Sequence, residues 1–198
     1  MSSVLIIFIK NPRRGYVKTR LARTVGEDEA LRIYQYLLDK TRQAAIGVQA
    51  RRLLFYSDVM EAADAWSETD FEKRVQSDGD LGARMEQAFR QAFSEGAQKA
   101  GIIGSDCPAL DGAALETAFQ QLEQADFVLG PTPDGGYYFL GMRAFEPSVF
   151  QDIAWSTETV LTQTLAQIRK LRKTVSLLPV LSDIDTETDW LAYKKHEL

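Results

Sequence analysis

Short apolar runs and amphipathic helical segments alternate along nearly the whole of this 198-residue sequence, and this alternation limits the possible folds. Apolar runs bounded by turn residues predict strands, whereas apolar residues spaced three and four apart predict helices. The expected strands are residues 4–9, 52–56, 72–76, 100–104, 126–130, 137–142 and 174–181. The expected helices are residues 27–46, 111–125 and 157–172, with another that begins near residue 83 and a short one at the end. The pattern predicts an α/β sandwich with a mostly parallel sheet, in which the neighbouring strands 126–130 and 137–142 can introduce an antiparallel member.

The length and composition fit one domain that spans residues 1–198. Hydrophobic residues make up 45% and charged residues 26%, which is ordinary for a globular protein, and no repeat or linker divides the chain. The net charge of −5 disfavours a general nucleic-acid binder, and no apolar run is long enough to span a membrane. A single cysteine, Cys107, excludes an internal disulfide, and the first ten residues lack the features of a signal peptide. We therefore expect a cytoplasmic protein.

A cationic stretch follows the first expected strand. Residues 10–23 read KNPRRGYVKTRLAR and hold six of the 23 Lys and Arg residues, although the chain as a whole is acidic. Loops at the carboxyl ends of parallel strands bind ligands in open α/β sheets, and Lys and Arg suit phosphate groups. Lys18 and Arg20 share a face if the stretch is extended and diverge if it is helical. On this stretch alone, a solvated basic loop is an equal alternative.

Carboxylates follow two further strands. Asp106 lies in the sequence GSDCP, and Asp183 and Asp185 lie in SDIDTETDW. Carboxylate oxygens are the ligands that Mg²⁺ and Mn²⁺ prefer, commonly one or two of them together with substrate phosphates. We expect Asp106 and Asp185 to approach one another and share a cation, with Asp183 as the alternative second ligand. Asp106 can also be a turn or helix-capping aspartate, and for this residue taken alone that interpretation is as good. Thr186 with Asp189 fits a capping box, which leaves Asp185 just outside the last helix.

A turn with two glycines, PDGGYY, separates the strands 126–130 and 137–142. A structural turn at Asp134 is the favoured interpretation. Gly135 and Gly136 would also let a ligand approach the backbone. Tyr137 and Tyr138 alternate faces, and we expect Tyr137 to line a substrate pocket and the other tyrosine to pack.

These motifs together resemble one family. A first strand followed by KNPRRGYVKTRLA, then DLGARM, GSDCP, PDGGYYFLG, WST and DIDTETDW, is similar over almost the full chain to the uncharacterised bacterial DUF2064 proteins. Members are often described as nucleotide-diphospho-sugar transferases or family A glycosyltransferases. The resemblance implies a glycosyltransferase-A-like fold, which is a three-layer α/β/α sandwich with a mostly parallel mixed sheet.

The layout is also similar to that of 2-phospholactate guanylyltransferase-type nucleotidyltransferases. Those enzymes carry a Lys-Ser-Arg-Leu-type loop where this chain has KTRL, and a Gly-Leu-Asn loop that DLGARM approximates without the Asn. In sugar-nucleotide synthetases the metal is shared by aspartates at the places that Asp106 and Asp185 match. GSDCP has only one Asp, however, whereas glycosyltransferases commonly carry Asp-x-Asp.

The resemblance implies a metal-dependent transferase that uses a nucleotide-activated donor, first of all a nucleotide-diphospho-sugar, with a small acceptor. One alternative is a nucleotidyltransferase that releases pyrophosphate from an NTP, and another is a non-catalytic nucleotide-binding regulator. Lys18 and Asp106 are the expected catalytic residues, and Asp106 and Asp185 the expected ligands of Mg²⁺ or Mn²⁺. The expected nucleotide-binding residues are Lys10, Lys18, Arg20, Gly79, Leu81, Gly82 and Arg84, and the expected substrate pocket contains Asp134, Gly135, Gly136 and Tyr137. The base, the sugar, the acceptor and the oligomeric state stay open.

Overall fold

The first strand, β1 (Ser3–Ile9), lies near the middle of a seven-stranded sheet with the order β3-β2-β1-β4-β6-β5-β7. The computed structural model describes residues 2–197, and side chains through residue 195. The other strands are β2 (Arg51–Tyr56), β3 (Glu72–Val75), β4 (Lys99–Ile103), β5 (Phe127–Pro131), β6 (Tyr137–Met142) and β7 (Val175–Leu177). β6 runs antiparallel to both β4 and β5, and the remaining pairs are parallel.

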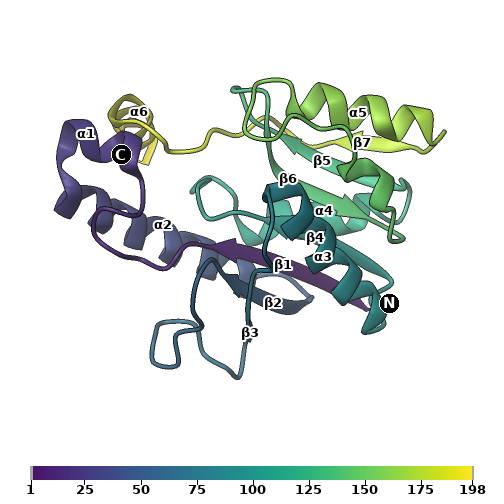
Figure 1. Cartoon of the computed structure of the whole chain (residues 1–198), viewed down its shortest axis with the longest axis horizontal. Helices are drawn as coiled ribbons and strands as arrows, with labels where there is room; N and C mark the ends of the chain where they lie inside the picture. The colour runs from purple at the N-terminus through teal and green to yellow at the C-terminus, as the bar shows by residue number, and fades with distance from the viewer. Residues whose placement is uncertain (1, 198) are drawn as a thin grey trace.

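Helices cover both faces of the sheet (Figure 1). They are α1 (Thr19–Val25), α2 (Glu27–Ile46), α3 (Leu81–Ser94), α4 (Gly112–Gln121), the 3₁₀ helix η1 (Pro147–Phe150), α5 (Val160–Lys170) and α6 (Glu187–Glu197). Alternate residues of β1 point to opposite faces, so Leu5 packs with α2 and α4, whereas Ile6 packs with α3 and α5. The result is a three-layer sandwich, as predicted. No helix within residues 2–197 is long and apolar enough to cross a bilayer.

The strand and helix pattern predicted from the sequence is confirmed, including the bounds of α2 and β6 and the antiparallel position of β6. Two expectations were wrong. Residues 19–25 form the helix α1, although the run of cations had suggested a loop through residue 23. The last strand ends at Leu177 and does not continue to residue 181, because Pro179 has no N–H to donate to a neighbouring strand.

The direction of chain travel reverses between β1 and β4. From β1 the chain continues through α2 to β2 on one side, and after β3 it returns through α3 to β4 on the other side of β1. Helices α2 and α3 lie on opposite faces of the sheet, so the carboxyl ends of β1 and β4 flank a topological switch point. The basic stretch leaves β1 at this point, and the GSDCP segment leaves β4.

A small third cluster of apolar residues covers this end of the sheet. Leu21 of α1 packs with Ile33 and Leu37 of α2 and with Ile184, which precedes α6. Figure 1 shows α1 and α6 side by side beyond the carboxyl end of β1. The carboxyl-terminal part of the chain is thereby held against the loop that carries the basic residues.

Candidate functional site

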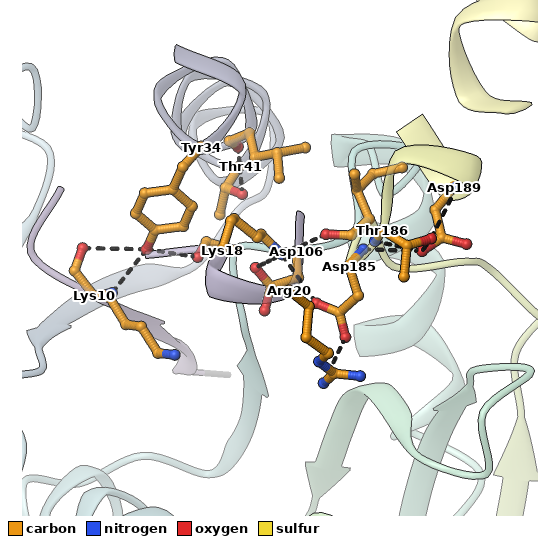
Figure 2. Close-up of polar contacts among 12 residues, drawn as sticks. Lys10, Lys18, Arg20, Tyr34, Thr41, Asp106, Asp185, Thr186 and Asp189 are labelled. Atoms are coloured by element: carbon orange, nitrogen blue, oxygen red, sulfur yellow. Dashed lines mark hydrogen bonds and ion pairs between the residues drawn. The ribbon is translucent and has the colours of Figure 1, made fainter. Parts of the chain in front are cut away.

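Lys18 is the central residue of the candidate site. It precedes α1 in a left-handed conformation, with φ 47° and ψ 45°, and only 5% of its side chain is exposed. Its Nζ lies 2.5 Å from Asp106 Oδ1, 2.6 Å from the carbonyl oxygen of Ile184 and 3.4 Å from Asp185 Oδ1 (Figure 2). A left-handed backbone is uncommon for a lysine, and here it lies directly before the first turn of α1. We call Lys18, Arg20, Asp106 and Asp185 the Lys18 cluster.

Asp106 follows the end of β4, and a hydroxyl from α2 contacts the residue before it, Ser105. Tyr34 accepts a hydrogen bond from the backbone N–H of Lys10 at 2.8 Å, and its hydroxyl lies 3.1 Å from the Lys10 carbonyl and 3.2 Å from Ser105 Oγ. Burial raises the pKa of Tyr34, so it stays protonated as a donor. Tyr34 thus ties the loop after β1 to the loop after β4. The sequence did not reveal this role, because Tyr34 lies on the buried face of α2 at a spacing that is typical of a core residue.

Asp185 reaches the same place from the far end of the chain. Ile184 is buried and donates its N–H to the Asp106 carbonyl at 2.8 Å, while its own carbonyl accepts from Lys18. The expected capping box is present, since Thr186 N donates to Asp189 Oδ2 at 2.7 Å and Asp189 N donates to Thr186 Oγ1 at 3.3 Å. The Asp185 side chain is therefore not needed to cap α6.

The predicted closeness of Asp106 and Asp185 is confirmed, because both carboxylates contact one ammonium group. Arg20 contacts the second oxygen of Asp185, with Nη2 3.0 Å from Oδ2. Since α1 begins at Thr19, the side chains of Lys18 and Arg20 diverge: Lys18 is enclosed and Arg20 is 70% exposed. Both nevertheless contact the Asp185 carboxylate, Lys18 from the enclosed side and Arg20 from the exposed side.

Asp183 adds a further negative charge. Burial raises the pKa of Asp183 to about 7, and Asp106, Asp134 and Asp185 contribute to the rise while Lys18 opposes it. Asp134, in the turn before β6, therefore contributes to the negative potential around Asp183. The site therefore holds more carboxylates than cations.

The neighbouring thiol is inert. Burial raises the pKa of Cys107 to about 12, which leaves almost no thiolate at neutral pH. Cys107 is a buried member of the core that lies next to Asp106 in the sequence.

The PDGG turn is held by Asp134, whose Oδ1 accepts from Thr132 Oγ1 at 2.5 Å and from Gly136 N at 3.1 Å. Gly135 has φ +86°, and a Cβ on it would lie 2.0 Å from the carbonyl oxygen of Glu158. The close approach expected of a ligand at Gly135 is thus made by the protein backbone. A Cβ on Gly136 would meet Thr132 Oγ1 at 3.1 Å, so this position is also crowded.

Tyr137 does not have the predicted place in an open pocket. Its hydroxyl is buried, and it lies beside the buried hydroxyl of Thr164 on α5. Burial raises the pKa of Tyr137, and the ring packs in the core between the sheet and the helices α3 and α5. The alternation along β6 places Tyr138 on the other face, where its hydroxyl donates to the Pro179 carbonyl at 2.9 Å.

The segment 79–84 forms the entry to α3. Gly79 has φ +109°, and Asp80 caps the helix by accepting from Ala83 N at 2.8 Å. Leu81 is 37% exposed. Gly82 is buried, and a Cβ on it would lie 2.1 Å from Nε1 of Trp155, so the space that was expected to admit a ligand is filled by an indole ring.

Arg84 and Lys10 lie near the ends of β1 and β2. Arg84 Nη1 donates to Gln76 Oε1 at 3.2 Å, and Gln76 Nε2 donates to the carbonyls of Ile9 and Phe55, each at 3.3 Å. Lys10 has an exposed side chain that forms no ion pair with the side chains described, residues 2–195. Both cations therefore lie near the carboxyl end of β1, Arg84 on the side of β2, and neither contacts the Lys18 cluster.

The carboxylates fit a divalent cation only in part. Asp106 and Asp185 supply hard oxygens, keep 46% and 35% of their side chains exposed, and already converge on one cationic group. Within the described residues, no group of three or more His, Cys, Asp or Glu side chains is arranged to hold a metal ion. A cation at these two residues would thus need other oxygens, such as those of phosphate, to complete its coordination.

A shallow hollow of about 490 Å³ lies elsewhere, between α4 and β7. Its lining includes Thr117, Gln121 and Ser176, at the amino ends of β5 and β7. The carboxyl ends of β1 and β4 lie at the opposite ends of the strands, so this hollow belongs to a different part of the molecule.

Comparison with known proteins agrees with this fold. A family profile described as "Uncharacterized protein conserved in bacteria (DUF2064)" matches residues 39–157. A solved structure from Desulfovibrio desulfuricans G20, provisionally described as a nucleotide-diphospho-sugar transferase, has 32% identity and a TM-score of 0.84, covering 94% of this chain and 84% of that one. No curated protein matches the chain.

Two more distant structures share the fold alone. CMP:2-keto-3-deoxy-manno-octonic acid synthetase complexed with CTP has 12% identity and a TM-score of 0.59, with full coverage of both chains. The manganese complex of Rv0371C from Mycobacterium tuberculosis H37Rv has 18% identity and a TM-score of 0.53, covering 97% of each chain. The predicted fold class is confirmed by these similarities.

Proposed function

The chain belongs to the DUF2064 family and has the fold of nucleotide-diphospho-sugar transferases and nucleotidyltransferases, and we propose that it is a metal-dependent transferase that uses a nucleotide-diphospho-sugar donor. The observation that carries the proposal is the Lys18 cluster at the carboxyl ends of β1 and β4. Open α/β sheets bind ligands at this kind of switch point. The provisional description of the relative from Desulfovibrio desulfuricans names the same class of donor.

The cationic members of the cluster suit the donor diphosphate. Lys18 has an enclosed ammonium with three donors on a flexible stem, and Arg20 has a planar guanidinium exposed to solvent at the rim. Cations that are already in place where negative charge develops lower the barrier to departure of a diphosphate. In the proposed function Lys18 is the catalytic cation, and Arg20 orients the outer phosphate.

Asp106 and Asp185 would hold Mg²⁺ or Mn²⁺, whose positive charge neutralises a leaving diphosphate when the cation is bound. The remaining donor-binding residues are Arg84 and Lys10, together with the segment 79–84 at the entry to α3. Their place around the end of β1 supports contact with the nucleoside part of the donor. Asp134 lies close enough to raise the pKa of Asp183, and we propose that Asp134 and the turn around it receive the acceptor.

Nucleotidyl transfer is a second candidate, favoured by the fold shared with the CTP complex of the synthetase. The same cluster would then stabilise the α-phosphate under attack, and pyrophosphate would leave from an NTP. The single aspartate of GSDCP also favours this candidate, since the Asp-x-Asp pattern common in glycosyltransferases is missing from the sequence at that place.

A thermal-shift panel of NDP-sugars, NTPs and NDPs, each with Mn²⁺ and with EDTA, tests the proposal. A ligand that binds the folded state raises the apparent melting temperature as its concentration exceeds Kd. We expect an NDP-sugar to stabilise the protein with Mn²⁺, and Asp106→Asn to abolish the shift. Release of the nucleoside diphosphate on addition of acceptors supports glycosyl transfer, and release of pyrophosphate from an NTP supports the second candidate. Absence of any shift with all donors would contradict both.

A further inference from the structure

The Lys18 ammonium lies where the two proposed metal ligands converge. Nζ is 2.5 Å from Asp106 Oδ1 and 3.4 Å from Asp185 Oδ1, and the Ile184 carbonyl accepts from it at 2.6 Å (Figure 2). These three oxygens match the three N–H donors of an ammonium group. To donate to a phosphate, Lys18 must release at least one of these partners.

A divalent cation on Asp106 would lie beside this ammonium. Two positive charges a few Å apart repel one another, and the repulsion is strong where solvent is excluded, as it is around a side chain that is 5% exposed. With Lys18 in place, the contacting oxygen of Asp106 is already occupied by a donor, and Asp185 is shared with Arg20. The ammonium and the metal therefore cannot both use these carboxylates at full strength.

Lysine is suited to such an exchange. Its charge is a compact point on a flexible stem, so it can move between partners, whereas an arginine would hold a carboxylate with two parallel bonds. In the Lys18 cluster without donor or metal, two cations face two carboxylates. A metal that entered alone would leave this cluster with an excess of positive charge. A donor diphosphate that enters with the metal would supply both the missing negative charge and a new partner for Lys18.

We propose that Lys18 and the divalent cation compete for Asp106 and Asp185, so that the metal binds tightly only when donor phosphate takes up the Lys18 ammonium. This inference deepens the proposed function and rests on it. It makes Lys18 an internal cation that closes the site in the absence of donor. Binding of metal and of diphosphate is then positively coupled, and each must raise the affinity of the other by the same factor.

The test measures Mn²⁺ alone, by the free-ion signal in electron paramagnetic resonance, and pyrophosphate alone, by calorimetry. Lys18→Met keeps the apolar stem, and Lys18→Gly suits the left-handed backbone at this position. We expect both variants to bind Mn²⁺ about tenfold more tightly than wild type and pyrophosphate about tenfold less tightly, the size of one charge-assisted hydrogen bond. A misfolded site would weaken both ligands, so the opposite signs separate the proposal from a structural role.

Arg23→Ala is the matched control, since Arg23 is an exposed cation in the last turn of α1 and its loss changes the net charge equally. We expect it to leave both affinities unchanged, and Asp106→Asn to remove the gain in Mn²⁺ binding from the Lys18 variants. Equal Mn²⁺ affinity in wild type and both Lys18 variants would overturn the competition and leave the metal-dependent function standing. Absence of Mn²⁺ binding in every variant, with or without pyrophosphate, would overturn the metal dependence itself.

Discussion

Two clusters of four charges occupy different places on the sheet, and each contains two cations and two carboxylates. The Lys18 cluster lies at the carboxyl ends of β1 and β4. A second cluster lies at the amino ends of β2 and the edge strand β3, and it joins both strands to the end of α3. We call it the edge cluster, and its members are Arg51, Glu72, Arg74 and Glu95. The two differ in how completely their charges are matched.

In the edge cluster each guanidinium holds carboxylates with several bonds. Arg51 donates to both oxygens of Glu72, at 2.5 and 2.6 Å, and to Glu95 at 2.5 Å. Arg74 donates to both oxygens of Glu95, at 2.8 and 2.9 Å. Hydrogen bonds from Arg74 and Arg51 lower the pKa of Glu95 to about 2. Such forked pairs are geometrically specific and leave no partner free for a ligand.

The charges of the Lys18 cluster are paired less completely. Its inner cation is a lysine with single bonds to several oxygens, and the nearby Asp183 is an extra carboxylate whose pKa is raised to about 7. Burial first, and then the neighbouring carboxylates, raise the pKa of Asp183, whereas ion pairing with Arg74 and Arg51 lowers the pKa of Glu95. The contrast separates a cluster whose carboxylates are held by forked ion pairs from one whose inner cation can exchange its partners.

The largest expected effect concerns Asp183. Its pKa rises from 3.8 to about 7 on folding, so the folded protein retains a proton that the unfolded chain loses. The stabilisation that comes from this retained proton is therefore fully present below pH 3.8 and is lost as the pH rises through about 7. The upper bound of this loss is about 4 kcal/mol. Asp183→Asn should remove it, making the variant more stable than wild type above pH 7 and nearly equal near pH 4.

Urea denaturation of both proteins between pH 4 and 8, in EDTA, measures this difference. EDTA keeps metal ions from changing the protonation of the site. The difference between the two stabilities isolates Asp183, because other titrating groups contribute to both proteins. Parallel pH profiles would show that the Asp183 carboxyl group is solvated in the folded state.

The next effect distinguishes the clusters by ligand binding. Lys18→Ala should weaken UDP and GDP by about tenfold or more in saturating Mn²⁺, because one charge-assisted hydrogen bond to phosphate is lost. Arg51→Ala removes a cation from the edge cluster and should lower stability while leaving both nucleotides bound at wild-type affinity. Calorimetric titration with parallel thermal denaturation gives both readouts. A loss of nucleotide affinity in Arg51→Ala that equals the loss in Lys18→Ala would erase the proposed distinction.

A smaller effect belongs to Glu95. Since its folded pKa of about 2 lies below the ordinary value of 4.5, its stabilisation is present above pH 4.5 and is lost as the pH falls through about 2. The side chain is 30% exposed, and solvent screening limits the contribution to about 1 kcal/mol. Glu95→Gln should therefore be less stable than wild type at pH 7 and equal to it near pH 2. A difference that stays constant with pH would assign the loss to packing.

The sequence predicted those features that depend on local pattern. The long apolar stripe of α2 and the turn before β6 gave the bounds of both elements, and the capping box correctly placed Thr186 and Asp189 at the start of α6. The closeness of Asp106 and Asp185 could be predicted because both follow strands of one sheet, and because each matches a metal position in related folds.

The remaining features depend on tertiary packing and could not be read from pattern. The left-handed backbone of Lys18, which turns its ammonium inward, has no signal in the run of cations around it. The buried Ile184 links Lys18 to the Asp106 loop through its backbone, which every residue type possesses. Gly82 and Gly135 were assigned to ligand approach, but the chain itself approaches them, through Trp155 and Glu158. A glycine shows that something comes close, and only the fold shows what it is.

The smallest expected effect concerns the rim of the Lys18 cluster. Arg20 is 70% exposed and pairs with Asp185 in solvent, so its phosphate contact is screened and competes with an existing partner. Arg20→Ala should weaken UDP and GDP by about threefold, less than Lys18→Ala, because an exposed ion pair contributes about 0.2–1 kcal/mol. The control is the double variant Arg13→Ala/Arg14→Ala, in which Arg14 already pairs with Glu27 at 3.2 Å and Asp28 at 2.7 Å. The double variant should bind both nucleotides as wild type does, because the partners of Arg14 belong to the protein. If it instead loses more affinity than Arg20→Ala, the phosphates lie at the tip of the basic loop, and the enclosed Lys18 ammonium serves the fold in the same way as the edge cluster.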